Sequence, residues 1–143
     1  MNSSKSQGFT LVELIVVVSI VSILVSIAIP SYFSYMASAR RADAKNTILT
    51  LASYQERYHS NNGFYGSVQD LTGNVTLESD SGNYVMTVVC VPNAACTAAT
   101  RPQQYTITAT AQVQDLTCGN YLYNQSGAIT FSVANATLDE CWN

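Results

Sequence analysis

The chain carries little charge and a single histidine. Only 10% of its 143 residues are charged, against about a quarter in an average soluble domain, and its formal net charge is −3. Six basic residues on an acidic chain do not supply the broad positive surface that neutralises the phosphates of nucleic acids. His59 has no cysteine or acidic residues near it at metal-ligand spacing. The sequence therefore indicates no metal site.

The residue patterns of a catalytic centre are missing as well. There is no recognisable set of nucleophile, base and orienting group, and no glycine-rich loop of the kind that binds phosphate. We therefore expect no catalytic residues, no cofactor and no enzymatic activity. The length of 143 residues allows one domain of ordinary size and no second one.

What the chain does have is a long apolar segment close to its N-terminus. Residues 9–29 read FTLVELIVVVSIVSILVSIAI, with a single charge. At 1.5 Å per residue, a helix of this length crosses a hydrocarbon core of about 30 Å. A short polar leader, MNSSKSQG, precedes the segment and ends in Gly8. A secretory signal peptide has its cleavage site after the apolar stretch, whereas cleavage at Gly8 would leave this stretch on the mature protein.

The hexapeptide GFTLVE at residues 8–13 resembles, residue by residue, the processing motif of type IV pilins and their pseudopilin relatives. By that resemblance, a prepilin peptidase cuts between Gly8 and Phe9 and methylates the new amino group of Phe9. The chain would then be held in a bacterial inner membrane by one transmembrane helix, with a periplasmic head. The resemblance further implies that it is polymerised with other pilin subunits, at an inner-membrane assembly platform, into an extracellular pilus.

Glu13 is an acidic residue inside the apolar segment. Such a group costs about 2.5 to 3.5 kcal/mol at the bilayer centre and less toward the interface, which makes it a candidate functional residue. The expected cleavage creates a nearby cation, the amino terminus of the same chain or of a neighbouring subunit in a dry filament core. In pilins the second arrangement is proposed to set subunit register. The alternative is an interfacial acid whose carboxylate reaches water.

One long helix is expected after the leader, with a break at Pro30. Proline removes a backbone donor and kinks or locally opens a helix, but the 3.6-residue period resumes and continues to about Tyr58. Residues 9–30 would form the transmembrane and filament-core helix, and residues 31–60 an amphipathic helix of the head. A basic cluster on this second part, Arg40, Arg41 and Lys45, could be a lipid-headgroup patch, a DNA patch or a solvated helix face, and we favour the solvated face.

Residues 61–143 are expected to form a loop of about 20 residues, an antiparallel sheet and a C-terminal region closed by a disulfide. Strand patterns occur at 84–91, at 105–112, around 122 and at 129–133. Three or four strands with one apolar face need a cover, which the amphipathic half of the helix supplies. The predicted fold class is therefore α+β, with a long N-terminal helix packed on a small sheet.

The four cysteines all follow the apolar segment, so they would lie in an oxidising periplasm and form disulfides. They are Cys90, Cys96, Cys118 and Cys141. Four cysteines allow three pairings. We choose the nearest-neighbour pairs, Cys90 with Cys96 and Cys118 with Cys141, and the second pair resembles the disulfide-bounded C-terminal region of many pilins.

The leading functional prediction is a structural subunit of a type IV pilus, a minor pilin, that supports assembly and pilus-dependent adhesion, twitching motility or DNA uptake. Residues 28–66 resemble a subset of minor pilins that includes DNA-uptake receptors. A DNA receptor that binds through residues 91–102 and Arg101 ranks lower, because the chain is acidic and three of its five mature basic residues lie near the start of the helix. A pseudopilin of type II secretion is the third candidate. It ranks below a pilus subunit because pseudopilins often lack a paired-cysteine tail such as the one in this chain.

Overall fold

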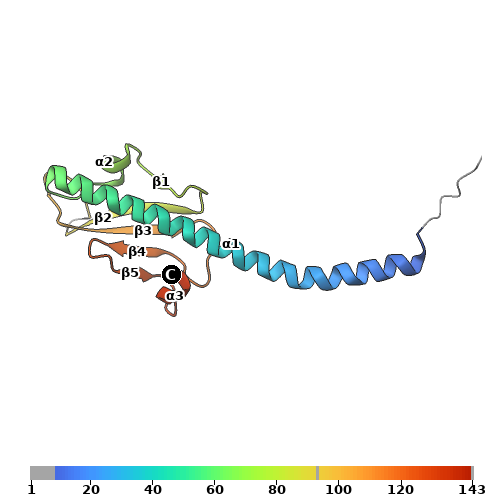
Figure 1. Ribbon diagram of the computed structural model, residues 1–143. Helices are drawn as coiled ribbons and strands as arrows, with labels where there is room; N and C mark the ends of the chain where they lie inside the picture. The colour runs from blue at the N-terminus through green and yellow to red at the C-terminus, as the bar shows by residue number, and fades with distance from the viewer. Residues whose placement is uncertain (1–8, 93, 143) are drawn as a thin grey trace, which may run out of the picture. The chain divides into compact units, whose positions relative to one another are not determined.

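The computed structural model describes residues 9–92 and 94–142, so Gly8 and the rest of the leader lie outside the described residues. The chain divides into two compact units, Met1–Met36 and Ala37–Asn143. The described part of the first unit is helical, and the second unit, here called the head, contains the sheet (Figure 1). Helix α1, Leu11–Asn62, contributes to both units.

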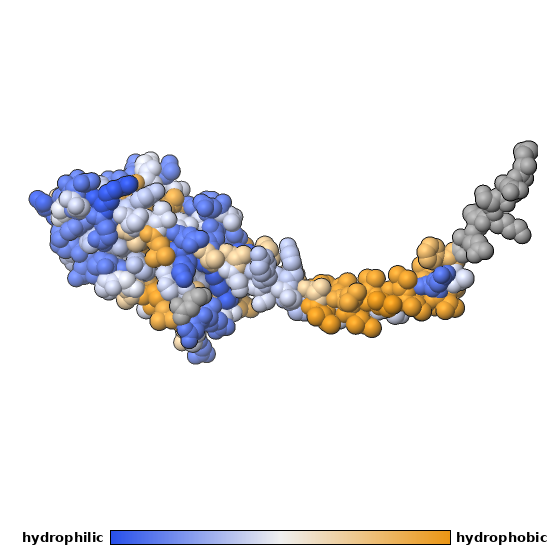
Figure 2. All heavy atoms as spheres, viewed as in Figure 1, coloured by the Kyte–Doolittle hydropathy of each residue, from blue (hydrophilic) through white to orange (hydrophobic). Residues whose placement is uncertain are grey.

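Among the described residues, α1 is the one helix that is long and apolar enough to cross a membrane, and its apolar part lies in the first unit. The mean hydropathy of its most apolar window is 2.8, and none of that window is buried. Figure 2 shows this part of the chain as an almost continuous hydrophobic surface. Its length and composition therefore suit a hydrocarbon environment.

Pro30 lies inside α1, and the helix is not interrupted there. One long helix therefore continues through this residue, as the resumed helical period predicted, and a kink there stays a prediction. Proline removes one backbone donor and its ring crowds the carbonyl four residues earlier, but its fixed φ of about −65° is compatible with a helix. The end differs slightly, because α1 stops at Asn62, where Gly63 takes a φ of 75° and donates to the carbonyl of His59 at 2.7 Å.

The head contains one antiparallel sheet whose strand order follows the sequence. Its strands are β1 (Leu77–Glu78), β2 (Tyr84–Val91), β3 (Gln104–Ala111), β4 (Tyr121–Asn124) and β5 (Ile129–Phe131). Alternate side chains such as Met86 and Ile107 are buried on one face, where they belong to the same core as Ile48 and Leu51 of α1. Figure 1 shows α1 lying across this face. The predicted α+β fold, a long helix packed on a small antiparallel sheet, is therefore confirmed.

The expected loop after α1 contains two further elements, helix α2 (Val68–Thr72) and strand β1. Ser67 and Asp70 form a reciprocal capping box at the start of α2, and Gly73 ends it with a φ of 78°. The spacing of Ser67 and Asp70 is the sequence signal of such a cap. The side chain of the fully buried Gln55 holds the segment to α1, because its amide accepts from Gly66 N at 3.0 Å and donates to Gly66 O at 2.7 Å.

Two disulfides link Cys90 to Cys96 and Cys118 to Cys141, which are the nearest-neighbour pairs. The second bridge connects the segment before β4 to the short helix α3 (Leu138–Cys141). The tail is also fixed by Trp142, whose ring lies on Tyr123 with 6.2 Å between centroids. The C-terminal region is thus attached to the sheet by covalent and aromatic contacts.

Removing the tail disulfide by the paired change Cys118→Ser and Cys141→Ser is expected to lower the free energy of unfolding by about 3 kcal/mol, because the unfolded chain regains the freedom of a loop of that length. The matched pair Cys90→Ser and Cys96→Ser opens a much shorter loop and should cost about 1 kcal/mol less. Denaturant unfolding of the head, measured on the mature chain in detergent micelles, gives both values. Equal losses, or a larger loss for the shorter loop, would contradict this explanation.

Two members of the basic cluster on α1 are bound by partners within the head and are only partly exposed. Arg41 Nε and Nη2 donate to the two carboxylate oxygens of Asp115 at 2.8 and 2.9 Å. Burial raises the pKa of Asp115, but hydrogen bonds from Arg41 and from two backbone N–H groups outweigh it, so this pKa lies below its usual value. The stability that the pair contributes is present at neutral pH and is lost as the pH falls through the folded-state pKa. Lys45 donates to the carbonyl of Trp142, which leaves Arg40 as the remaining member.

Candidate functional site

Glu13 closes the N-terminus of α1 together with Thr10. The backbone N–H and the hydroxyl of Thr10 both donate to Glu13 Oε2 at 3.0 Å, and Glu13 N donates to Thr10 Oγ1 at 3.2 Å. This is a reciprocal capping box, which satisfies donors that a helix start leaves unpaired. The pattern Thr-x-x-Glu is visible in the sequence and is the signal that could have identified the role of Thr10.

A carboxylate can accept hydrogen bonds on both of its oxygens. Among the described residues, no hydrogen bond reaches Oε1 of Glu13, because both contacts from Thr10 go to Oε2. The side chain therefore caps its own helix through one oxygen and has the other available for a second donor. This geometry is compatible with a cation from a neighbouring chain.

Aromatic side chains mark the other end of the apolar segment. Tyr32, Phe33 and Tyr35 are 61%, 66% and 71% exposed, and such residues gather at membrane interfaces. Glu13 precedes Tyr32 by 19 residues, which corresponds to about 28 Å along a helix. When these aromatic rings lie at one interface of a 30 Å core, Glu13 lies close to the other one. Its carboxylate can then remain solvated in the membrane.

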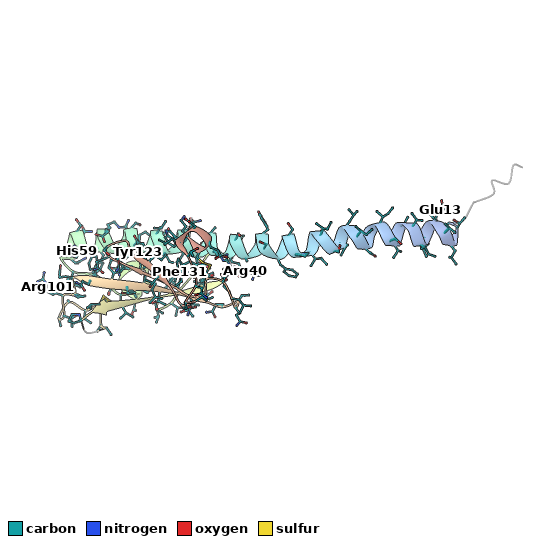
Figure 3. The ribbon with its side chains drawn as sticks, turned by 90° about the horizontal axis from the view of Figure 1, so that it is seen from below. Glu13, Arg40, His59, Arg101, Tyr123 and Phe131 are labelled. Carbon is teal, nitrogen blue, oxygen red and sulfur yellow. A yellow bond between two sulfur atoms is a disulfide. The ribbon has the colours of Figure 1, made fainter. Side chains whose placement is uncertain are left out.

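The second candidate site lies at one end of the head. Figure 3 shows His59 and Arg101 together at this end, with Arg40 at the opposite end of the sheet. The guanidinium of Arg101 lies 6.0 Å from the ring centre of Phe64, which itself contacts Tyr58 with 5.7 Å between centroids. Tyr58 and Arg57 line a small hollow beside α1. We call these residues the distal surface: Arg57, Tyr58, His59, Phe64 and Arg101.

Arg101 is held in an unusual backbone conformation. Its φ of 42° lies in the left-handed region, which costs a residue with a side chain about 1 kcal/mol or more. The neighbouring side chain of Gln103 fixes the segment, because its amide donates to Gly63 O at 2.9 Å and contacts His59 Nε2 at 3.1 Å. Strain of this kind persists only where the surrounding structure enforces it, and it concentrates at functional sites.

The basic side chains of the distal surface form no ion pair in the described structure, although Asp70 lines the same hollow as Arg57. The one ion pair among the described residues joins Arg41 to Asp115, whereas Arg57 and Arg101 are exposed and lie over the rings of Tyr54 and Phe64. Arginine next to aromatic rings is a combination that binds phosphate and stacks on bases. Arg101 was a candidate on sequence grounds but Arg57 was not, since a single arginine on an amphipathic helix carries no special signal.

A metal centre has no support in the described part of the chain. No three His, Cys, Asp or Glu side chains gather there in an arrangement that could hold an ion. His59 is occupied instead by stacking on Tyr65, with 4.5 Å between ring centroids, and by its contact with Gln103. Its role in the described structure is packing and positioning.

A family model described as type IV minor pilin ComP, DNA uptake sequence receptor, matches residues 30–122. The chain belongs to this pilin family. A second model, the prokaryotic N-terminal methylation motif, matches residues 3–29, the segment that contains GFTLVE. The predicted pilin resemblance is therefore confirmed, and the apolar helix anchors this pilin in the inner membrane before it is assembled into an extracellular pilus.

Individual relatives are also pilins. The chain is 35% identical over 96 residues to the type IV major pilin protein PilE of Neisseria gonorrhoeae, and 32% identical over 79 residues to the type IV major pilin protein PilA of Myxococcus xanthus. These matches cover 67% and 55% of this pilin but only 57% and 34% of the relatives, so the chain spans about half or less of their length. A solved type IV pilin from Shewanella oneidensis is 20% identical, with a TM-score of 0.49 over 75% of this chain and 98% of its own.

Proposed function

We propose that this pilin is a minor subunit of the pilus that binds duplex DNA during uptake, through its distal surface and without catalysis of its own. The description of its family supports the class of ligand. The observation that carries the proposal is Arg101, a strained and exposed arginine without an acidic partner in the described structure. Composition alone ranked a DNA receptor below other pilus roles. With these two observations, DNA binding becomes the preferred function.

One carboxylate of this acidic chain is offset by a basic partner, and two others are held in contacts with the backbone. Asp115 is bound by Arg41, Asp70 caps α2, and Asp43 accepts from the backbone of Ser81 at 3.2 Å. Arg57 and Arg101 form no ion pair with any of these carboxylates in the described structure. Few phosphate contacts imply that each subunit binds DNA weakly and with a shallow salt dependence.

The same proposal includes the processing and assembly steps. A prepilin peptidase cuts after Gly8, the amino group of Phe9 is methylated, and residues 9–30 stay in the membrane until extraction. The free oxygen of Glu13 then receives the amino terminus of a neighbouring pilin subunit at the assembly platform. Support comes from the methylation-motif match and from the one-sided use of the carboxylate by Thr10.

A deletion strain tests the proposed function. We expect the strain to keep its pili and to lose transformation by added DNA, because a sparse receptor is not needed to build the filament. The measurements are pilus counts by electron microscopy and transformation frequency, with a copy of the gene restored as the control. Loss of the pili themselves, or normal transformation, would contradict the proposal.

A further inference from the structure

A cavity of about 190 Å³ opens at the end of the head opposite the distal surface, where Figure 3 shows Arg40. Arg40, Arg41 and Asp115 all line it. Because Arg41 binds both oxygens of Asp115, those two charges neutralise each other. Among the described residues no ion pair or hydrogen bond reaches the guanidinium of Arg40, so the cavity keeps one uncompensated positive charge.

Two exposed aliphatic side chains lie on the same cavity. Leu116 is 78% exposed and Val113 is 46% exposed, and both line its wall. Leu116 and Val113 thus place apolar surface beside the unpaired guanidinium of Arg40. A phospholipid can bind both features of this cavity. Its phosphate accepts hydrogen bonds from a guanidinium, and aliphatic side chains can insert at the boundary between its headgroup and its acyl chains.

The chain itself keeps this cavity near a membrane surface. Arg40 follows Tyr35, the last of the exposed aromatic residues after the apolar segment, by five positions. Even a fully extended chain of five residues spans at most about 18 Å, and a helix spans about 7.5 Å. The headgroup layer adds several ångströms of reach on the membrane side. Arg40 is thus tethered within reach of phosphate groups whatever the orientation of the head.

We propose that this cavity binds the phosphodiester group of a membrane phospholipid, with Arg40 donating to the phosphate while Leu116 and Val113 enter the acyl boundary. The contact holds the head on the membrane before the subunit is extracted, and it is broken on assembly. This inference rests on the membrane anchor and is independent of DNA binding. The solvated helix face favoured on sequence grounds for Arg40 is replaced by a lipid-headgroup site.

The test uses the mature full chain in dodecyl maltoside micelles, which contain no phosphate, with labelled arginine and labelled leucine and valine methyl groups. Dihexanoyl phosphatidylglycerol, dihexanoyl phosphatidylcholine and inorganic phosphate are titrated separately and followed by NMR. We expect saturable shifts of the Arg40 Nε–H and the Leu116 methyl groups with either phospholipid. Comparison of the two lipids shows whether an anionic or a zwitterionic headgroup is preferred.

Two variants and one control complete the design. Arg40→Ala should weaken phospholipid binding by about tenfold or more, the loss expected for one charge-assisted hydrogen bond. Leu116→Ser should weaken phospholipid binding and leave any phosphate response unchanged. The matched control Arg57→Ala, at the distal surface, should change neither.

Three results would overturn the lipid site. The first is an equal affinity for inorganic phosphate with no response of Leu116, which would indicate a free-anion site. The second is a phospholipid shift that Arg40→Ala does not weaken, because it would reflect general mixing with the micelle. The third is the absence of any saturable shift, which would mean that the cavity does not bind phospholipid.

Discussion

Replacing Glu13 by alanine is expected to leave membrane insertion intact and to stop incorporation of the subunit into pili. Insertion should persist or improve, because an apolar side chain removes the cost of an acid in the apolar segment. Incorporation should fail, because the amino terminus of the neighbouring subunit would be buried without a counter-charge, which costs about 3 to 5 kcal/mol. Immunoblots of membranes and of sheared pili measure the two steps separately.

Two variants separate the charge of Glu13 from its role as a cap. Glu13→Gln keeps the oxygen that Thr10 binds but removes the charge, so we expect it to fail like alanine. Thr10→Val removes the hydroxyl that takes part in the capping box and keeps the carboxylate, so it should cost about 1 kcal/mol of helix stability and reduce incorporation only partly. Normal pilus incorporation of Glu13→Ala would refute the proposed role of this residue.

Arg101→Gly is expected to lower DNA affinity while leaving the free energy of unfolding almost unchanged. Glycine adopts the left-handed φ of this position without the penalty of a side chain, and this gain offsets its greater freedom in the unfolded chain. The free energy of unfolding should therefore stay within about 1 kcal/mol of the wild-type value. DNA affinity should fall about tenfold or more, because one charge-assisted phosphate contact is lost.

The matched control for this change is Arg40→Ala. Arg40 is also an arginine without an ion-pair partner in the described structure, but it lies at the opposite end of the head. Its replacement should leave DNA affinity and the salt slope unchanged. If both variants weakened DNA binding equally, the effect would be one of net charge and not of the distal surface.

Regular patterns in the sequence were sufficient to predict the main elements. The β-branched run at 84–91 has the bounds of β2, and the alternation from residue 105 lies within one residue of β3. Such alternation is decisive because one face of each strand is buried against α1. The helical period likewise predicted an amphipathic helix over residues 31–60, where Ile48 and Leu51 are fully buried.

Short elements were missed because side-chain caps, and not long periods, define them. Helix α2 has five residues, too few for a hydrophobic period, and depends on Ser67 and Asp70 at its start. Pro30 was assigned a break because proline disrupts helices in general. The helix α1 continues through Pro30, and the expected kink stays a prediction.

The candidate sites were only partly visible in the sequence. Glu13 was identified by its charge in an apolar segment, but its contact with Thr10 required the structure. The basic cluster on α1 was interpreted as solvated because its partners, Asp115 and Trp142, lie far along the chain. The strain at Arg101 has no sequence signal, since it is imposed by contacts between segments that are distant in the chain.

DNA affinity of the mature chain in detergent micelles, measured as a function of salt with wild type, Arg101→Gly and Arg40→Ala, tests the central claim most directly. The account predicts salt-dependent binding of duplex DNA by wild type and by Arg40→Ala. Arg101→Gly should bind about tenfold or more weakly, with a logarithmic salt slope lower by about 0.9, the value for one lost phosphate contact. Wild-type binding no tighter than that of Arg101→Gly, at equal salt and equal stability, would contradict it.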